Sequence, residues 1–263
     1  MIELQNVRKS FDGGKSYAVA DTSFTVERGE LLGLIGESGS GKTSTLRMIN
    51  RLEEPSHGDI FVNGENVMQQ NPQTLRRNIG YVFQGIGLFP HYTVAENVAV
   101  VPRLLGYPDK RVLERTKATL AMVGLPFEEY AERRPAQLSG GQQQRVGVAR
   151  ALAAEPDVML MDEPFGALDP ITRAELQEEF KRIQKELQLT VIMVTHDMTE
   201  ALLMADRIAV MKHGEVLQIG SPAELLHSPA HSYVTEMVEM PRLMSDRLAQ
   251  VLSGHHEMGQ GYE

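Results

Sequence analysis

Residues 31–50 read LLGLIGESGSGKTSTLRMIN, and this stretch decides the fold. The run LLGLIG is continuously apolar, without alternation, which is typical of a parallel strand buried on both faces. The segment GESGSGKT, which begins at Gly36, matches the pattern G-x-x-x-x-G-K-[ST], and TSTLRMIN then begins a helix. A strand, a glycine-rich loop and a helix in this order predict a phosphate-binding loop at residues 36–43.

The chemistry of such a loop assigns a role to each of its parts. Backbone N–H groups at the start of the helix point at phosphate oxygens, and the helix dipole favours negative charge there. Lys42 would place its positive charge on the outer phosphates, and the hydroxyl of Thr43 would be a ligand of Mg²⁺. We therefore expect a nucleotide site that comprises Gly36, Glu37, Ser38, Gly39, Ser40, Gly41, Lys42, Thr43 and Ser44.

The rest of the chain extends this α/β pattern. In the opening third, runs such as IELQNV, TSFTVE and DIFVNG have strand character with turns between them. From about Thr93 to Ala154 apolar residues recur at helical spacing. We expect this helical pattern to break near three prolines: Pro102, Pro108 and Pro126. After Pro156 strands alternate with helices, which indicates a parallel sheet with a helical insert in an α/β nucleotide fold.

Composition and charge narrow the class of protein. Hydrophobic residues make up 42% of the 263 residues and charged residues 23%, which is typical of a folded globular chain. Cysteine is absent, so disulfides and thiolate metal sites are excluded and a reducing compartment is expected. MIELQNVRKSF shows strand character rather than a secretion signal, and the apolar runs are too short to cross a bilayer. A net charge of −9 argues against general affinity for nucleic acid.

A phosphate loop needs a partner carboxylate from a distant strand end, and VMLMDEP at residues 158–164 supplies two. Asp162 would hold the Mg²⁺ shell, and Glu163 would face the γ-phosphate as the general base for water. The alternative interpretation is an acidic pair that caps a neighbouring helix. The phosphate loop in the same chain favours the catalytic pair.

The motif LSGGQ at Leu138–Gln142 is a second glycine-rich segment. It resembles the signature motif of ATP-binding-cassette (ABC) ATPases, and the other motifs of that family occur in the family's order. Gln84 in YVFQ matches the Q-loop glutamine, and MDEP matches the Walker B aspartate followed by the catalytic glutamate. GALD matches the D-loop with its Asp169, and His196 in VTHD matches the switch histidine. The resemblance covers about residues 1–240.

This resemblance implies a P-loop NTPase (RecA-like) α/β core with an N-terminal antiparallel β subdomain and an inserted α-helical signature subdomain. It implies one ABC ATPase domain over residues 1–240, with the helical subdomain at about 88–155. Residues 241–263 would form a C-terminal helical or loose tail without CBS domains. Within that tail, RLMSDRLAQVLSG has apolar positions at helical spacing, and the residues from Ser253 onward look loose.

The resemblance also implies why one chain carries two glycine-rich motifs. In this family two copies form a head-to-tail dimer, and the signature of one copy faces the ATP held by the phosphate loop of the other. Ser139 would hydrogen-bond γ-phosphate oxygens, and the glycines and the helix dipole would favour close approach. The residues expected to act on the partner's nucleotide are Leu138, Ser139, Gly140, Gly141, Gln142 and Asp169.

The remaining roles are carried over by position. The catalytic residues implied are Glu163, His196, Lys42 and Gln84, and the Mg²⁺ ligands are Thr43, Gln84 and Asp162, the last through a water. His196 would hydrogen-bond the γ-phosphate and the attacking water, and Gln84 would touch Mg²⁺ or that water. An aromatic residue before the loop would stack on adenine. Phe11 fits that place best, and Tyr17 is the second choice.

Transport is favoured over the soluble ABC ATPases of DNA repair, chromosome or ribosome work. The segment between residues 43 and 138 is too short for a long coiled coil, and the chain has one cassette rather than two. Stretches such as LRRNIGYVFQGIGLFPH and LSGGQQQRVGVARALAAEPDVMLMDEPFGALDPITR resemble importers of quaternary amines, namely glycine betaine, choline and carnitine. An importer of another small polar solute, such as an amino acid, and a soluble ABC ATPase without a transport role are the alternatives.

An importer ATPase implies particular partners. We expect a homodimer, two integral membrane permease subunits and an extracytoplasmic substrate-binding protein, with no nucleic acid. The chain would lie peripherally on the cytoplasmic face of a prokaryotic inner or plasma membrane. Leu88, Phe89 and Pro90 in IGLFPH would line the groove that receives a short coupling helix of the permease. Gly85 stands where the family often has a second glutamine.

Overall fold

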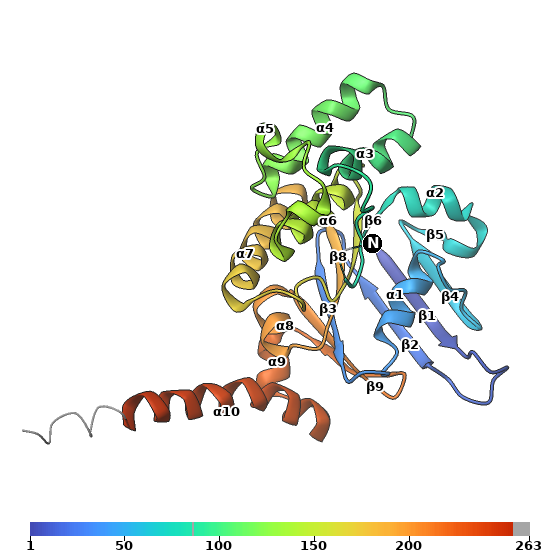
Figure 1. Cartoon of the computed structure of the whole chain (residues 1–263). Helices are drawn as coiled ribbons and strands as arrows, with labels where there is room; N and C mark the ends of the chain where they lie inside the picture. The colour runs from blue at the N-terminus through green and yellow to red at the C-terminus, as the bar shows by residue number, and fades with distance from the viewer. Residues whose placement is uncertain (86, 255–263) are drawn as a thin grey trace, which may run out of the picture.

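The computed structural model describes residues 1–85 and 87–254, and a ten-stranded sheet runs through this part of the chain (Figure 1). The strands lie in the order β5-β4-β1-β2-β10-β9-β3-β8-β7-β6. Their bounds are β1 Ile2–Lys9, β2 Val19–Val26, β3 Leu31–Gly36, β4 His57–Val62, β5 Glu65–Asn66, β6 Ile79–Val82, β7 Val158–Asp162, β8 Thr190–Thr195, β9 Arg207–Lys212 and β10 Glu215–Gly220.

Helices and short 3₁₀ turns connect these strands. Their bounds are α1 Lys42–Ile49, η1 Val67–Gln69, α2 Pro72–Arg77, α3 Val94–Leu104, α4 Asp109–Met122, α5 Phe127–Tyr130, η2 Pro135–Gln137, α6 Gly140–Leu152, α7 Pro170–Leu187, α8 Met198–Met204, α9 Pro222–His227 and α10 Ser232–Gly254. In the part of the chain that the structure describes, none of these helices combines the length and apolarity needed to cross a membrane.

The centre of the sheet is parallel and buried on both faces. β3 pairs in parallel with β8 and β9, β7 pairs in parallel with β8, and β6 pairs in parallel with β7. Every residue of β3 is buried, and its side chains alternate between two cores: Leu31 and Ile35 join one, and Leu32 and Leu34 join the other. The parallel pairing brings the carboxyl ends of β3, β6, β7 and β8 to one edge of the sheet.

The other end of the sheet is mainly antiparallel. β1 pairs with β2 and β4, and β4 pairs with β5, all antiparallel. β10 joins the two parts, because it pairs in parallel with β2 and antiparallel with β9. The predicted fold class, an α/β P-loop core with an N-terminal antiparallel β part and a helical insert, is confirmed. The pattern did not reveal β5, β6, β10, α2 or α9 because these elements are short or only half-buried.

The helices α3 to α6 gather at one end of the molecule, where Figure 1 draws them in green to yellow-green. The helical pattern does break near Pro102, although α3 continues through this residue and ends at Leu104. Pro102 falls in the last turn of α3, so it removes a single N–H from the helix and interrupts few backbone hydrogen bonds. Pro108 and Pro126 do mark boundaries, since each precedes the first residue of a helix, α4 and α5.

The C-terminal helix is longer than the sequence pattern suggested. α10 begins at Ser232 and continues through Pro241, so no helix boundary coincides with the predicted start of the tail. Ser253 and Gly254 are its last residues, whereas the rest of the predicted loose segment, 255–263, lies outside the described residues. Figure 1 shows α10 at the end of the molecule opposite to α4, with part of the helix extending beyond the body.

Candidate functional site

The phosphate loop joins β3 to α1 and takes a shape that two of its glycines make possible. Gly36 ends β3, and a Cβ atom there would lie 2.1 Å from the carbonyl oxygen of Met211. Gly41 precedes α1 with φ 98°, and a Cβ atom there would lie 2.4 Å from the carbonyl oxygen of Ala18. Both contacts are with backbone, which cannot move aside cheaply. The loop is therefore pressed between β9 and the segment that leads into β2.

Lys42 folds back into this loop. Its Nζ donates hydrogen bonds to the carbonyl oxygens of Gly36 at 2.7 Å and Glu37 at 2.8 Å. The side chain is buried, and burial lowers the pKa of Lys42. The nearby carboxylates of Glu163 and Asp162 act in the opposite direction and raise this pKa. The ammonium group is thus held at the mouth of the loop by acceptors from the loop's own backbone.

A hydroxyl and a carboxylate meet beside the loop. Thr43 at the start of α1 donates its hydroxyl proton to Asp162 Oδ1 at 3.0 Å. Asp162 ends β7 and is 3% exposed. Burial raises the pKa of Asp162 above its ordinary value, whereas the hydrogen bond from Thr43 acts in the opposite direction. Two oxygen atoms of the kinds that Mg²⁺ prefers therefore lie together.

Glu163 lies at the centre of a polar cluster contributed by three strand ends. Gln84 follows β6 and donates from its Nε2 to Glu163 Oε2 at 3.0 Å. His196 follows β8 and places its Nδ1 3.4 Å from Glu163 Oε1. Glu163 itself has φ 46°, a left-handed conformation that costs a non-glycine residue about 1–2 kcal/mol. Strain of this kind is often found where the geometry of a functional side chain matters.

The signature residues form the start of α6. Ser139 Oγ accepts from the N–H of Gln142 at 3.3 Å, and Gln142 Oε1 accepts from the N–H of Ser139 at 3.0 Å. Gly141 faces α7, because a Cβ atom there would lie 2.5 Å from Thr172 Cγ2. Gly140 has no heavy atom within 4 Å of its Cβ position among the described residues. Leu138 is buried, so it anchors the motif in the core.

The D-loop residue lies beside the signature. Asp169 caps α7 and accepts the N–H of Thr172 at 3.1 Å, and this side chain's hydrogen bonds to Thr172 lower the pKa of Asp169. Since Thr172 also faces Gly141, the start of α6 and the start of α7 are neighbours. Within residues 1–85 and 87–254, no hydrogen bond or ion pair joins residues 138–142 to the phosphate loop at 36–44.

Both candidate adenine-stacking residues lie in the loop between β1 and β2. Asp12 organises this loop, because its Oδ1 accepts the N–H groups of Lys15 and Ser16 at 2.9 Å. The Asp12 carboxylate also accepts the hydroxyl of Ser16, and this bond contributes most to holding the pKa of Asp12 well below its usual range. Phe11 is 65% exposed and Tyr17 37% exposed. The choice of Phe11 before Tyr17 therefore stays a prediction.

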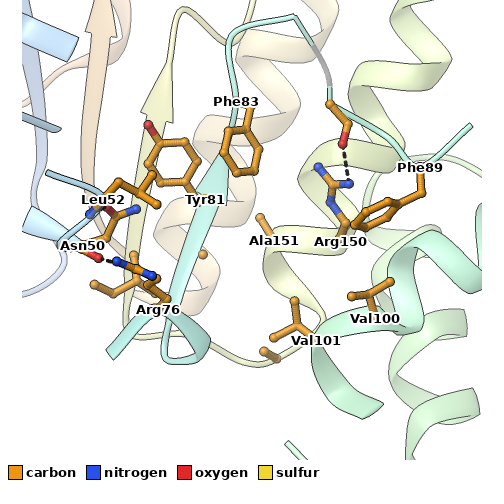
Figure 2. A pocket seen from close by; sticks show the side chains of 14 residues that line it. Asn50, Leu52, Arg76, Tyr81, Phe83, Phe89, Val100, Val101, Arg150 and Ala151 are labelled. Carbon is orange, nitrogen blue, oxygen red and sulfur yellow. Dashed lines mark hydrogen bonds between the residues drawn. The ribbon is translucent and has the colours of Figure 1, made fainter. Parts of the chain in front are cut away.

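A cavity of about 470 Å³ lies beside β6, the last strand of the sheet, between this strand and the helices α3 and α6 (Figure 2). Among the side chains that line it are Leu52, Tyr81, Phe83, Phe89, Val100 and Arg150. Of the three residues expected in a groove, Phe89 lines the cavity, whereas Leu88 packs against the core and Pro90 is not among the lining residues. Figure 2 shows Arg150 on one wall, where its Nη1 donates to the carbonyl oxygen of Gly87 at 2.8 Å.

Sequence patterns did not single out two residues that support the site. Arg150 belongs to the apolar run VGVARAL, and a cation on such a face indicates a buried partner. Tyr233 on α10 accepts the N–H of Glu37, a phosphate-loop amide, at 3.2 Å. No local pattern links Tyr233 to a loop so far away in the sequence.

The fold and this site define a P-loop nucleotide-binding α/β protein. The sequence model of the family described as ABC transporter matches residues 19–166, more than half of the chain. Curated proteins match over nearly the whole chain, 93% and 97% of it for the two relatives described below. The chain therefore belongs to the ABC transporter family.

Several curated relatives are similar over most of this chain. The choline transport ATP-binding protein OpuBA of Bacillus subtilis is 54% identical over 244 residues, which cover 93% of this chain and 64% of the relative. The osmoprotectant import ATP-binding protein OsmV of Salmonella typhimurium is 49% identical over 257 residues, which cover 97% of this chain and 67% of the relative. The chain thus spans about two thirds of the length of these relatives.

Solved structures agree with this assignment. A dimeric structure of the ATP-binding cassette MJ0796 bound to ADP and Pi has a TM-score of 0.75 and 35% identity, and covers 84% of this chain and 99% of the solved chain. The structure of cbiO1 from Clostridium perfringens, part of the ABC transporter complex cbiONQ, has a TM-score of 0.79 and 29% identity. It covers 92% of this chain and 96% of the solved chain.

Proposed function

We propose that this chain binds ATP with Mg²⁺ at the phosphate loop and hydrolyses it. The observation that carries the proposal is the position of Glu163, which lies between Gln84 and His196 at the same sheet edge as the phosphate loop. A carboxylate so placed can accept the proton of a water that attacks the outer phosphate. His196 would orient that water and hydrogen-bond the phosphate.

The residues beside Glu163 fit a magnesium nucleotide. Lys42 holds its ammonium group where the outer phosphates would lie, and a phosphate can replace the loop carbonyls as its acceptor. Thr43 and Asp162 offer a hydroxyl and a carboxylate 3.0 Å apart, and Gln84 would add its amide oxygen. The metal ion, when bound, would neutralise charge on the phosphates. Phe11, or failing that Tyr17, would stack on the adenine.

The proposal includes a head-to-tail homodimer in which each signature acts on the partner's nucleotide. In the described residues no hydrogen bond or ion pair joins residues 138–142 to the phosphate loop of the same chain, which supports this arrangement, and a dimeric structure is known for the similar cassette MJ0796. Ser139 and the first backbone N–H groups of α6 would face the partner's γ-phosphate. Asp169 and the 74% exposed Ile171 lie at the start of α7, on a surface suited to such a contact.

The partners of this cassette would be two integral membrane permease subunits and, through them, an extracytoplasmic substrate-binding protein. Support comes from the cavity with apolar and aromatic walls, in which Phe83 and Phe89 are each almost half exposed. An apolar groove is the kind of surface that takes the apolar face of an amphipathic helix, here a short coupling helix. This position would place the chain peripherally on the cytoplasmic face of the membrane.

We further propose that the solute is a quaternary amine such as glycine betaine, choline or carnitine. The support is the printed function of the relatives, which include a choline, a glycine betaine and a carnitine transport ATP-binding protein. The test is the uptake of radiolabelled betaine, choline and carnitine in a strain that lacks this protein alone. Uptake of at least one should fall to background. If uptake of each stays unchanged while uptake of another polar solute, such as an amino acid, is lost, the substrate class is wrong.

A further inference from the structure

Arg173 on α7 connects the D-loop with the segment that carries His196. Its Nη2 donates to the carbonyl oxygen of Leu168 at 3.1 Å and lies 3.5 Å from that of Gly166. Its Nη1 lies 3.7 Å from Asp197 Oδ2. One planar guanidinium group therefore contacts two loops that are separate in the sequence, a geometry that a lysine ammonium cannot reproduce.

Asp197 directly follows His196, and both of its carboxylate oxygens are engaged. Oδ1 accepts two backbone N–H groups from the first turn of α8, and Oδ2 faces Arg173. On the other side of the histidine, Thr195 Oγ1 accepts the N–H of Asp197 at 3.0 Å. The backbone around His196 is thus fixed, while its ring, which is 63% exposed, reaches Glu163.

A second side-chain contact joins α7 to α8 one turn further along α7. Gln177, four residues after Arg173 and on the same face of the helix, donates from its Nε2 to Glu200 Oε1 at 2.9 Å. Glu200 is 5% exposed and lies on α8. Together the two contacts fix how α7 lies along α8. Because the D-loop directly precedes α7 and His196 lies just before α8, they also fix the D-loop relative to His196.

We propose that Arg173 is a positioning residue for ATP hydrolysis: it fixes the approach of His196 to Glu163 through Asp197 and couples this approach to the D-loop carbonyls. The inference rests on the proposed function. Removal of the guanidinium group leaves the carbonyls of Leu168 and Gly166 without this donor and Asp197 without this cation. The segment of His196 can then shift, and small displacements of catalytic groups cost rate rather than binding.

The first test compares two arginines of the same helix in the purified chain. Arg173→Ala should lower kcat by about 10-fold or more, with the KM for MgATP changed less than about twofold. The KM should hold because the contacts of Arg173 described above lie outside the phosphate loop. The matched control is Arg182→Ala, since Arg182 is 62% exposed and pairs only with Glu186, at 3.7 Å, in the described chain. Its kcat should equal that of the unchanged chain.

The second test asks whether Arg173 acts through Asp197. Asp197→Asn keeps an oxygen acceptor for the start of α8 but removes the charge that faces Arg173. It should lower kcat to a similar degree, and the double variant Arg173→Ala with Asp197→Asn should be no slower than the worse single variant. Arg173→Lys retains the positive charge but not the planar guanidinium group with its several donors, so its kcat should lie between those of Arg173→Ala and the unchanged chain. If Arg173→Ala does not fold, as judged by thermal unfolding, Arg173→Lys and Asp197→Asn make the same comparison.

The outcomes separate this inference from the proposed function. A kcat of Arg173→Ala equal to that of Arg182→Ala would overturn the inference, as would losses that multiply in the double variant or a loss expressed in KM. Each of these results would leave the proposed ATPase intact. Absence of ATP hydrolysis by the unchanged chain would overturn both.

Discussion

The imidazole of His196 lies against the carboxylate of Glu163, with Nδ1 3.4 Å from Oε1. These two residues follow neighbouring parallel strands, β8 and β7, and Glu163 donates its backbone N–H to Val194 of β8 at 2.9 Å. The pairing of the strands therefore sets the distance between the two side chains. Because Glu163 also adopts a left-handed backbone conformation, its carboxylate is directed by the fold rather than by its own preference.

Lys42→Ala should abolish ATP hydrolysis. The substitution removes the buried ammonium group at the mouth of the phosphate loop, and losing one such electrostatic group costs about 100-fold or more in kcat. The measurement is the rate of phosphate release from MgATP by the purified variant. Lys110→Ala, which changes an exposed lysine on α4, is the control and should keep the full rate. Full turnover by Lys42→Ala would show that the loop is assigned to the wrong chemistry.

Phe11→Ala should weaken nucleotide binding more than Tyr17→Ala does. A base stacked on an aromatic ring is worth about 1–3 kcal/mol, and the loss should appear in the Kd for ATP measured by calorimetry. The two variants control for each other because both rings are exposed in the same loop. If Tyr17→Ala weakens binding and Phe11→Ala does not, adenine stacks on Tyr17, and the assignment of Phe11 as the stacking residue is wrong.

Glu163→Gln should convert the chain into a stable dimer in the presence of MgATP. The amide keeps the shape of the side chain but cannot accept the proton of water, so ATP persists. Two chains of net charge −9 repel each other, and we expect a monomer without nucleotide or with ADP. Gel filtration checks both states. A Glu163→Gln chain that stays monomeric in saturating MgATP would count against the ATP-bridged dimer.

Adding Ser139→Arg to Glu163→Gln should return the chain to a monomer in MgATP. Ser139 starts α6, and an arginine there puts bulk where the partner's γ-phosphate would lie and removes a hydroxyl hydrogen bond. Sedimentation of the double variant at the same ATP concentration gives the comparison. Persistent dimers would mean that the signature does not hold the partner's nucleotide.

Gly41→Ala should destabilise the fold more than Gly39→Ala. Both glycines have a left-handed backbone, φ 98° and 81°, so each substitution carries about 1–2 kcal/mol of backbone strain. Only at Gly41 would the new Cβ atom also collide with a backbone carbonyl, that of Ala18, whereas at Gly39 no atom lies within 4 Å in the described chain. Urea unfolding of the two variants measures the difference. Equal free energies of unfolding would show that the loop and the β2 lead-in are not packed as described.

The sequence by itself determined the parts of the site that are contiguous. The phosphate loop could be predicted because its function depends on backbone N–H groups and glycine conformations, which a short motif specifies locally. The same holds for the helix that begins at Gly140, whose start is capped by its own residues Ser139 and Gln142. The strand that ends at Asp162 was also readable, because an unbroken apolar run indicates burial on both faces.

Only the tertiary structure decided how these pieces meet. The order β3-β8-β7-β6 brings both Gln84 and His196 to the carboxylate of Glu163, at 3.0 Å and 3.4 Å, and no sequence spacing encodes a strand order. The contacts of Arg173 with Asp197 and with the carbonyl of Leu168 depend on how α7 lies against α8, which side-chain packing sets. Local sequence patterns indicate which residues are buried and which cap a helix. The distances between catalytic side chains depend on which helices and strands pack against each other, and local sequence does not specify these neighbours.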